Sequence, residues 1–178
     1  LSGGRVIHVV GVGWLEEAFD ANGVPFADRG RRHDDYVEAM RALWTQPKAS
    51  VHNTYVEFDQ CISRPQPAQS IPIVVGGHTR KAAERAARIG DGFFPGSGSI
   101  EDLGAAFGIV RGTCATLDRD PGEVELTASG GGRNFDELCA RVEQLIALGV
   151  SRTILSPLPE EQLLALAEGL QARFGMDV

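Results

Sequence analysis

Cysteine is scarce in this sequence, and its placement excludes the common cysteine-based sites. Only three cysteines occur among 178 residues, Cys61, Cys114 and Cys139, and no two of them form a C-x-x-C pair. An odd number at such spacing predicts neither a disulfide framework nor a zinc site. We expect all three to be small buried hydrophobic residues. His, Asp and Glu also show no ligand-like spacing, so no metal site is predicted.

Long apolar runs and an excess of positive charge are missing as well. No run approaches the ~20 apolar residues of a membrane span, and the first residues, LSGGR, lack the basic and apolar regions of a signal peptide. With 17 basic and 24 acidic residues, the formal net charge is −7. That balance excludes a basic surface for a nucleic acid or an anionic membrane. We therefore predict a cytoplasmic protein that binds neither.

What the sequence does contain is a regular alternation of apolar strands and helices. Five strand-then-helix units are predicted, with strands in segments 5–13, 71–75, 91–94, 123–129 and 151–157. Strands that alternate with helices of this length indicate an α/β fold of parallel strands with right-handed crossovers. An open doubly wound sheet and part of a (β/α)₈ barrel are both compatible. A complete barrel typically needs ~250 residues and eight units.

Between the first two units lie a long helix and a short hairpin. The helix is predicted over 28–46, with Tyr36, Val37, Met40, Leu43 and Trp44 on one stripe. The segment SVHNTYVEF (50–58) alternates like a hairpin outside the repeat. We expect the first strand, RVIHVVGVG, to be buried on both faces. In RGRRHDDY, the charged residues Arg32, Asp34 and Asp35 are expected to form ion pairs on the surface, whereas for Arg29 this is left open.

Ligands of such folds bind beyond the carboxyl ends of the strands. The loops there read GVGW, GGHT, PGSGS, SGGGR and SPLP, and four of the five are rich in Gly or Ser. Gly76, Gly77, His78 and Thr79 best suit a phosphate, because glycine exposes backbone N–H groups and the helix start adds partial positive charge. Turn geometry and helix capping by Thr79 would explain the same residues, so both interpretations stay open.

The remaining histidines do not form a catalytic arrangement. His8, His33 and His52 are expected in strand packing, on the helix surface and on the hairpin surface, respectively. Spacing alone identifies no nucleophile, base and orienting group, so the catalytic residues stay unassigned. The residues by themselves indicate an α/β protein that binds a phosphate-containing ligand.

Three longer motifs together resemble the bacterial luciferase-like monooxygenase family, especially its deazaflavin-dependent oxidoreductase branch. They are GVGWLEEAFDANGVPFADRGRRHDDYVEAMRALW, PQPAQSIPIVVGGHT and AARIGDGFFP, in family order across roughly the first half of the chain. The resemblance implies a TIM barrel whose strands 4 to 8, with a small hairpin insertion, lie in this chain. Residues 1–178 would then form a single domain, the C-terminal portion of the barrel, without the first three units and their catalytic histidine or glutamate.

The same resemblance implies a cofactor, either FMN or the deazaflavin coenzyme F420. Gly76, Gly77, His78 and Thr79 would contact its phosphate, and Gly11, Gly13 and Trp14 would lie near its ring. Asp91 and Gly92 match a family motif and are expected to serve loop geometry.

The implied function is an oxidoreductase or monooxygenase that transfers hydride between this cofactor and a small organic substrate. The alternative is a catalytically silent fragment that binds the cofactor phosphate or serves oligomerisation. A sugar-phosphate isomerase is less favoured, because the five loops contain no lysine. Five units leave two apolar strand edges open, so we expect a homo-oligomer or a preceding segment of chain to cover them.

Overall fold

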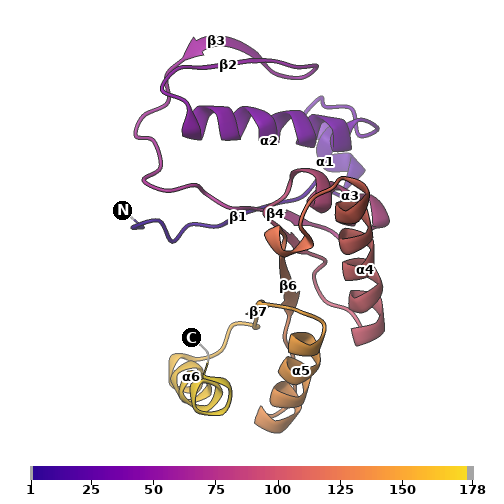
Figure 1. The fold of residues 1–178 in the computed structure, drawn as a ribbon, viewed down its shortest axis with the longest axis vertical. Coiled ribbons are helices and arrows are strands. Elements are labelled where there is room, and N and C mark those ends of the chain that lie inside the picture. Colours follow the sequence, from indigo (N-terminus) through magenta and orange to yellow (C-terminus); the bar gives the residue numbers. More distant parts are fainter. Residues whose placement is uncertain (1, 176–178) are drawn as a thin grey trace.

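The computed structural model describes residues 2–175 and contains a five-stranded parallel sheet (Figure 1). Its strands, in sheet order, are β1 (His8–Val10), β4 (Ile73–Gly76), β5 (Gly92–Phe94), β6 (Glu125–Ser129) and β7 (Arg152–Ile154). Each strand pairs in parallel with the next one in this sheet order. Within the described residues, each later strand of this sheet is therefore added at the same edge. In a doubly wound sheet, the chain would return to the opposite edge.

Six helices follow one another around the outside of the strands, as Figure 1 shows. They are α1 (Glu16–Ala21), α2 (Arg29–Thr45), α3 (Arg80–Ile89), α4 (Ile100–Thr116), α5 (Phe135–Ala147) and α6 (Glu160–Phe174), with a 3₁₀ turn η1 (Pro121–Glu123). Side-chain caps set three of the starts: Thr79, Ser99 and Asn134 each accept a hydrogen bond from the backbone N–H three residues on. All five predicted strand-then-helix units are thus present.

The predicted hairpin is also confirmed, and it lies on α2 rather than in the main sheet. Strands β2 (Ala49–His52) and β3 (Glu57–Cys61) pair antiparallel. Ala49 and Val51 of β2 pack against Ala39 and Ala42 of α2 in a small separate core. The hairpin therefore adds a layer outside the barrel-like repeat (Figure 1).

The main core lies between the sheet and helices α3 to α5. In register, Val75, Phe93 and Leu126 are neighbours on adjacent strands, and all three are buried in this core. Phe93 meets Phe107 of α4 edge-to-face, with ring centroids 6.2 Å apart and both side chains fully buried. Residues on the opposite face of the strands are the ones that would point into a barrel.

Two burial predictions for strand residues were wrong. The first strand is three residues long, and Val9 is 52% exposed rather than buried on both faces. It is exposed because β1 lies at the edge of the sheet, where Val9 has a strand neighbour, Val74, on one side only. Cys61 is exposed at the end of the hairpin, whereas Cys114 and Cys139 are buried as expected.

Candidate functional site

A cleft of about 730 Å³ opens where β1 and β4 end and α2 and α3 begin. It brings together every cofactor-binding residue predicted from the sequence: Gly11, Gly13, Trp14, Gly76, Gly77, His78 and Thr79. These residues come from two loops more than 60 positions apart. They meet because β1 and β4 are parallel neighbours, so that their carboxyl ends lie side by side.

Gly77 has a backbone geometry that side chains rarely tolerate. Its φ is +133°, and a Cβ there would lie 3.0 Å from the Cβ of Ala82. Its N–H donates to the carbonyl oxygen of Phe94 at 3.0 Å. Gly77 therefore shapes the loop, while its own N–H is already used by the neighbouring strand.

The groups free to bind an anion begin one residue later, at the start of α3. The backbone N–H groups of His78, Thr79, Arg80 and Lys81 have no acceptor within residues 2–175. The Thr79 hydroxyl accepts a hydrogen bond from Ala82 N–H at 3.2 Å, which confirms its capping role. Its own O–H is left to donate elsewhere. Capping and anion binding by Thr79 are therefore compatible.

Lys81 is a cleft residue that the loop-by-loop analysis missed. It lines the cleft from the first turn of α3, so counting lysines in the loops alone overlooked it. Helical periodicity could have found it, because an N-terminal turn faces the same ligand as the loop before it. Its ammonium adds a full charge to the partial positive charge of the helix start.

The other wall of the cleft is the GVGW loop. Gly13 has φ +80°, and a Cβ there would lie 2.7 Å from a ring carbon of Phe19. Trp14 is 83% exposed, so its indole offers an open planar surface. Arg29 ties this loop to α2, because its Nε donates to the carbonyl oxygen of Gly13 at 3.3 Å. The loop thus combines two glycines with one exposed aromatic plane.

Next to the cleft, the carboxylate of Asp34 binds two arginines of α3, Arg85 and Arg88. The Arg85 Nε donates to Asp34 Oδ1, and the Arg88 Nη2 donates to Asp34 Oδ2 at 3.0 Å. Burial alone would raise the pKa of Asp34, but hydrogen bonds from His33, Arg85 and Arg88 outweigh it and lower the pKa to about 2. Asp34 therefore forms ion pairs as predicted, but its partners are two arginines of α3. The prediction that His33 lies on the helix surface was wrong: it is 8% exposed, because α2 packs on α3 here.

Asp34→Asn is expected to change the acid side of the stability profile. A carboxylate with a lowered pKa stabilises the fold above its unfolded value near 3.8, and this contribution is lost as the pH falls towards 2. For a partly exposed network the contribution is about 1–2 kcal/mol. Urea unfolding from pH 6 to pH 2 should therefore show a smaller loss of stability below pH 4 in the variant. An equally steep loss in both proteins would contradict the role of Asp34.

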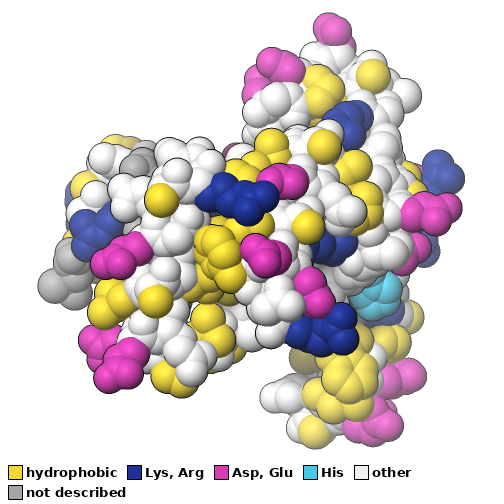
Figure 2. Space-filling model, turned by 90° about the horizontal axis from the view of Figure 1, so that it is seen from below, with side chains coloured by type: hydrophobic (Ala, Val, Ile, Leu, Met, Phe, Trp, Pro, Cys, Tyr) yellow, Lys and Arg dark blue, Asp and Glu magenta, His cyan; other side chains and the backbone are white. Residues whose placement is uncertain are grey.

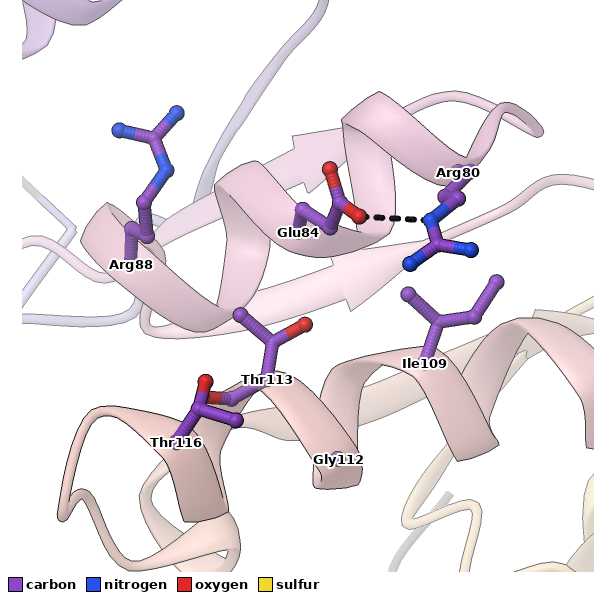
Figure 3. Close-up of a pocket in the computed structure, with 7 residues that line it drawn as sticks. All are labelled: Arg80, Glu84, Arg88, Ile109, Gly112, Thr113 and Thr116. Atoms are coloured by element: carbon purple, nitrogen blue, oxygen red, sulfur yellow. Dashed lines mark hydrogen bonds and ion pairs between the residues drawn. The ribbon is translucent and has the colours of Figure 1, made fainter.

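A second groove lies between α3 and α4, on the outer helical surface (Figure 3). Its volume is about 440 Å³, and Arg80, Glu84, Arg88 and Thr113 are among its lining residues. Arg80 donates to Glu84 at 2.7 Å, and Arg88 is bound to Asp34. Both arginines are therefore already paired, and no strand end reaches this groove.

The surface carries mixed charges. On the face shown in Figure 2, acidic, basic and hydrophobic side chains are interspersed. Within residues 2–175, no group of three His, Cys, Asp or Glu side chains is placed to hold a metal ion. None of the helices in that range has both the length and the apolar character to span a bilayer.

Comparison with known proteins adds a family to this geometry. The model of the family described as luciferase-like monooxygenase matches residues 1–131. An uncharacterized protein of Mycobacterium tuberculosis is 40% identical over 103 residues, which cover 58% of this chain and 35% of that protein. An FMNH₂-dependent dimethylsulfone monooxygenase of Pseudomonas putida is 31% identical over 119 residues, covering 64% and 33%. The chain thus spans about a third of the length of these relatives.

Among solved structures, the coenzyme F420-dependent tetrahydromethanopterin reductase of Methanopyrus kandleri superposes with a TM-score of 0.73. It is 15% identical, and the match covers 93% of this chain and 73% of that one. At this identity the likeness concerns the fold alone. Together with the unreversed strand order, it identifies the five units as part of a (β/α)₈ barrel.

Proposed function

We propose that this chain, which belongs to the luciferase-like monooxygenase family, binds FMN or coenzyme F420 in the cleft between α2 and α3 and forms part of an oxidoreductase. The substrate class would be a small organic molecule that exchanges hydride with the cofactor. The observation that carries the proposal is the start of α3, where His78, Thr79 and Lys81 line the cleft with free backbone N–H groups and Lys81 adds its ammonium.

The names of similar proteins support both cofactors. The Pseudomonas putida relative is FMNH₂-dependent. Two structures of similar fold are F420-dependent, an alcohol dehydrogenase and the tetrahydromethanopterin reductase. Both cofactors join a flat ring system to a phosphate group, so one cleft with a phosphate-binding end and a planar wall suits either.

The residues present fit such a group. The N–H groups of Thr79 and Lys81, with the Lys81 ammonium, would hold the phosphate. Gly11 leaves room for a ring to approach the backbone, whereas the space at Gly13 is taken by Phe19, and Trp14 offers an aromatic face beside it. The bound cofactor would supply the redox chemistry, while these residues bind and orient it.

A second candidate is a cofactor-binding part without chemistry of its own. Among the described residues that line the cleft, Asp28 is the single carboxylate. It accepts hydrogen bonds from the Tyr55 hydroxyl at 3.0 Å and from Arg32 at 3.4 Å. The Asp28 carboxylate thus already has structural partners. Detection of saturable cofactor binding without turnover would favour this candidate.

Lys81→Ala tests the proposed phosphate site, and Arg80→Ala is its matched control. Both changes remove one positive charge from the first turn of α3, but Arg80 pairs with Glu84 outside the cleft. A hydrogen bond to a charged group contributes about 1.5–3 kcal/mol, so Lys81→Ala should weaken FMN binding about tenfold or more. Fluorescence titration with FMN and with riboflavin, which lacks the phosphate, measures this.

The control and the phosphate-free ligand decide the interpretation. Arg80→Ala should leave FMN affinity within about twofold, because an exposed charge is largely screened. Riboflavin affinity should be the same in all three proteins. Equal losses in Lys81→Ala and Arg80→Ala would indicate a general charge effect and contradict a phosphate site at Lys81.

A further inference from the structure

Arg85 is a buried arginine whose outer nitrogens face the cleft without a protein partner. The residue is only 8% exposed and lines the cleft from the second turn of α3. Its Nε is bound by Asp34, but Nη1 and Nη2 have no acceptor within residues 2–175. Neither outer nitrogen is among the fully buried atoms that lack a partner, so both remain in contact with the cleft and are free to bind an anion.

A glycine of α2 makes room for this guanidinium. A Cβ on Gly30 would lie 2.6 Å from the Arg85 Nη2, so any side chain at position 30 would displace it. Gly30 lies in the first turn of a regular helix, where glycine lowers helix stability relative to alanine. No turn geometry requires glycine there, since its φ is not positive. The space is used by Arg85.

The carboxylate bound to Arg85 does not balance the positive charge around it. Asp34 is shared between Arg85 and Arg88, so one carboxylate faces two guanidinium groups. Arg85 also lies against the first turn of α2, where the helix dipole is positive and a cation is unfavourable. The backbone N–H groups of Gly30 and Arg31 in that turn have no acceptor in the described part of the chain. An anion at this position would satisfy all of these groups.

We infer that the cleft holds a second anion-binding site, formed by Arg85 and the start of α2, in addition to the one at the start of α3. The ligand of the cleft would then carry two separated anionic groups. This inference rests on the proposed function and adds a choice between the cofactors to it. FMN has one anionic group, its phosphate, whereas coenzyme F420 has a phosphodiester and carboxylates on its glutamyl tail. The second site therefore selects coenzyme F420.

Gly30→Ala is the sharpest test, because it moves the Arg85 guanidinium without removing any charge. Arg85→Met removes the charge, and Arg88→Met is the matched control, since Arg88 binds Asp34 but does not line the cleft. The 178-residue wild-type chain and the three variants would be titrated with coenzyme F420 and with FMN, following fluorescence. Thermal unfolding of each protein would verify that it is folded.

The expected result is selective. Gly30→Ala and Arg85→Met should each weaken F420 binding about tenfold or more and change FMN binding by less than about twofold, with Arg88→Met affecting neither. Equal losses for both cofactors, or no loss for either, would overturn the second site and leave the proposed function standing. Wild-type binding of FMN but not of F420 would overturn it as well. A folded wild-type chain that binds neither cofactor would overturn the proposed function together with this inference.

Discussion

Gly77→Asp should raise the dissociation constant for FMN or coenzyme F420 on the order of 100-fold. The φ of +133° at Gly77 is strained for any other residue, and its new Cβ would press against Ala82 at 3.0 Å. The added carboxylate would also stand just before the free N–H groups of α3, where it would compete with a phosphate. Fluorescence titration of the variant with both cofactors measures the loss.

Gly23→Asp is the matched control for this substitution. Gly23 also has a positive φ, +65°, but a Cβ there has open space around it, and the residue does not line the cleft. Its variant should bind both cofactors as the wild type does. Because Gly77→Asp also strains the loop, Gly77→Ser separates the two causes: it keeps the strain without the charge and should give a smaller loss. Wild-type affinity in Gly77→Asp would exclude the GGHT loop as the phosphate site.

The largest loss of stability is expected for Phe107→Ala. The side chain is fully buried and packs edge-to-face on Phe93, which joins α4 to the centre of the sheet. Truncating a buried phenylalanine costs about 3–5 kcal/mol in lost burial and cavity formation. Since domains of this kind are stable by only about 5–15 kcal/mol, the variant should be close to unfolding. Urea denaturation followed by circular dichroism would quantify the change.

Two further variants make this result interpretable. Leu164→Ala truncates a leucine of α6 that is 59% exposed, and it should change stability by less than about 0.5 kcal/mol. Phe107→Leu leaves most of the space filled and should fall between the two. A loss below about 1 kcal/mol for Phe107→Ala would mean that the sheet and α4 do not share a tightly packed core.

Local sequence signals predicted most of the architecture. The order of strands and helices followed from short apolar runs separated by helical stripes, and the hairpin followed from alternation in SVHNTYVEF. The cap at Thr79 followed from a hydroxyl residue placed just before a helix. Each of these signals depends on neighbours within a few residues. The convergence of GVGW and GGHT was also predictable, because parallel neighbours place their loops at one edge.

Other features could not be read from local patterns. Nothing near Asp34 in the sequence distinguishes it from an ordinary surface carboxylate, because its partner Arg85 is 51 positions away. The same holds for Gly30, whose missing side chain matters only because the Arg85 guanidinium occupies that space. The exposure of Val9 depends on which strand lies at the edge of the sheet.

The sequence by itself therefore determined the α/β repeat, the hairpin and the two glycine loops that line the cleft, since periodicity, turn residues and caps act over short distances. Only the tertiary structure decided which charges meet across the helices. It buried Arg85 against the start of α2 and bound it to Asp34. These outcomes depend on how α2 packs against α3, and packing between distant segments leaves no periodic trace in the chain.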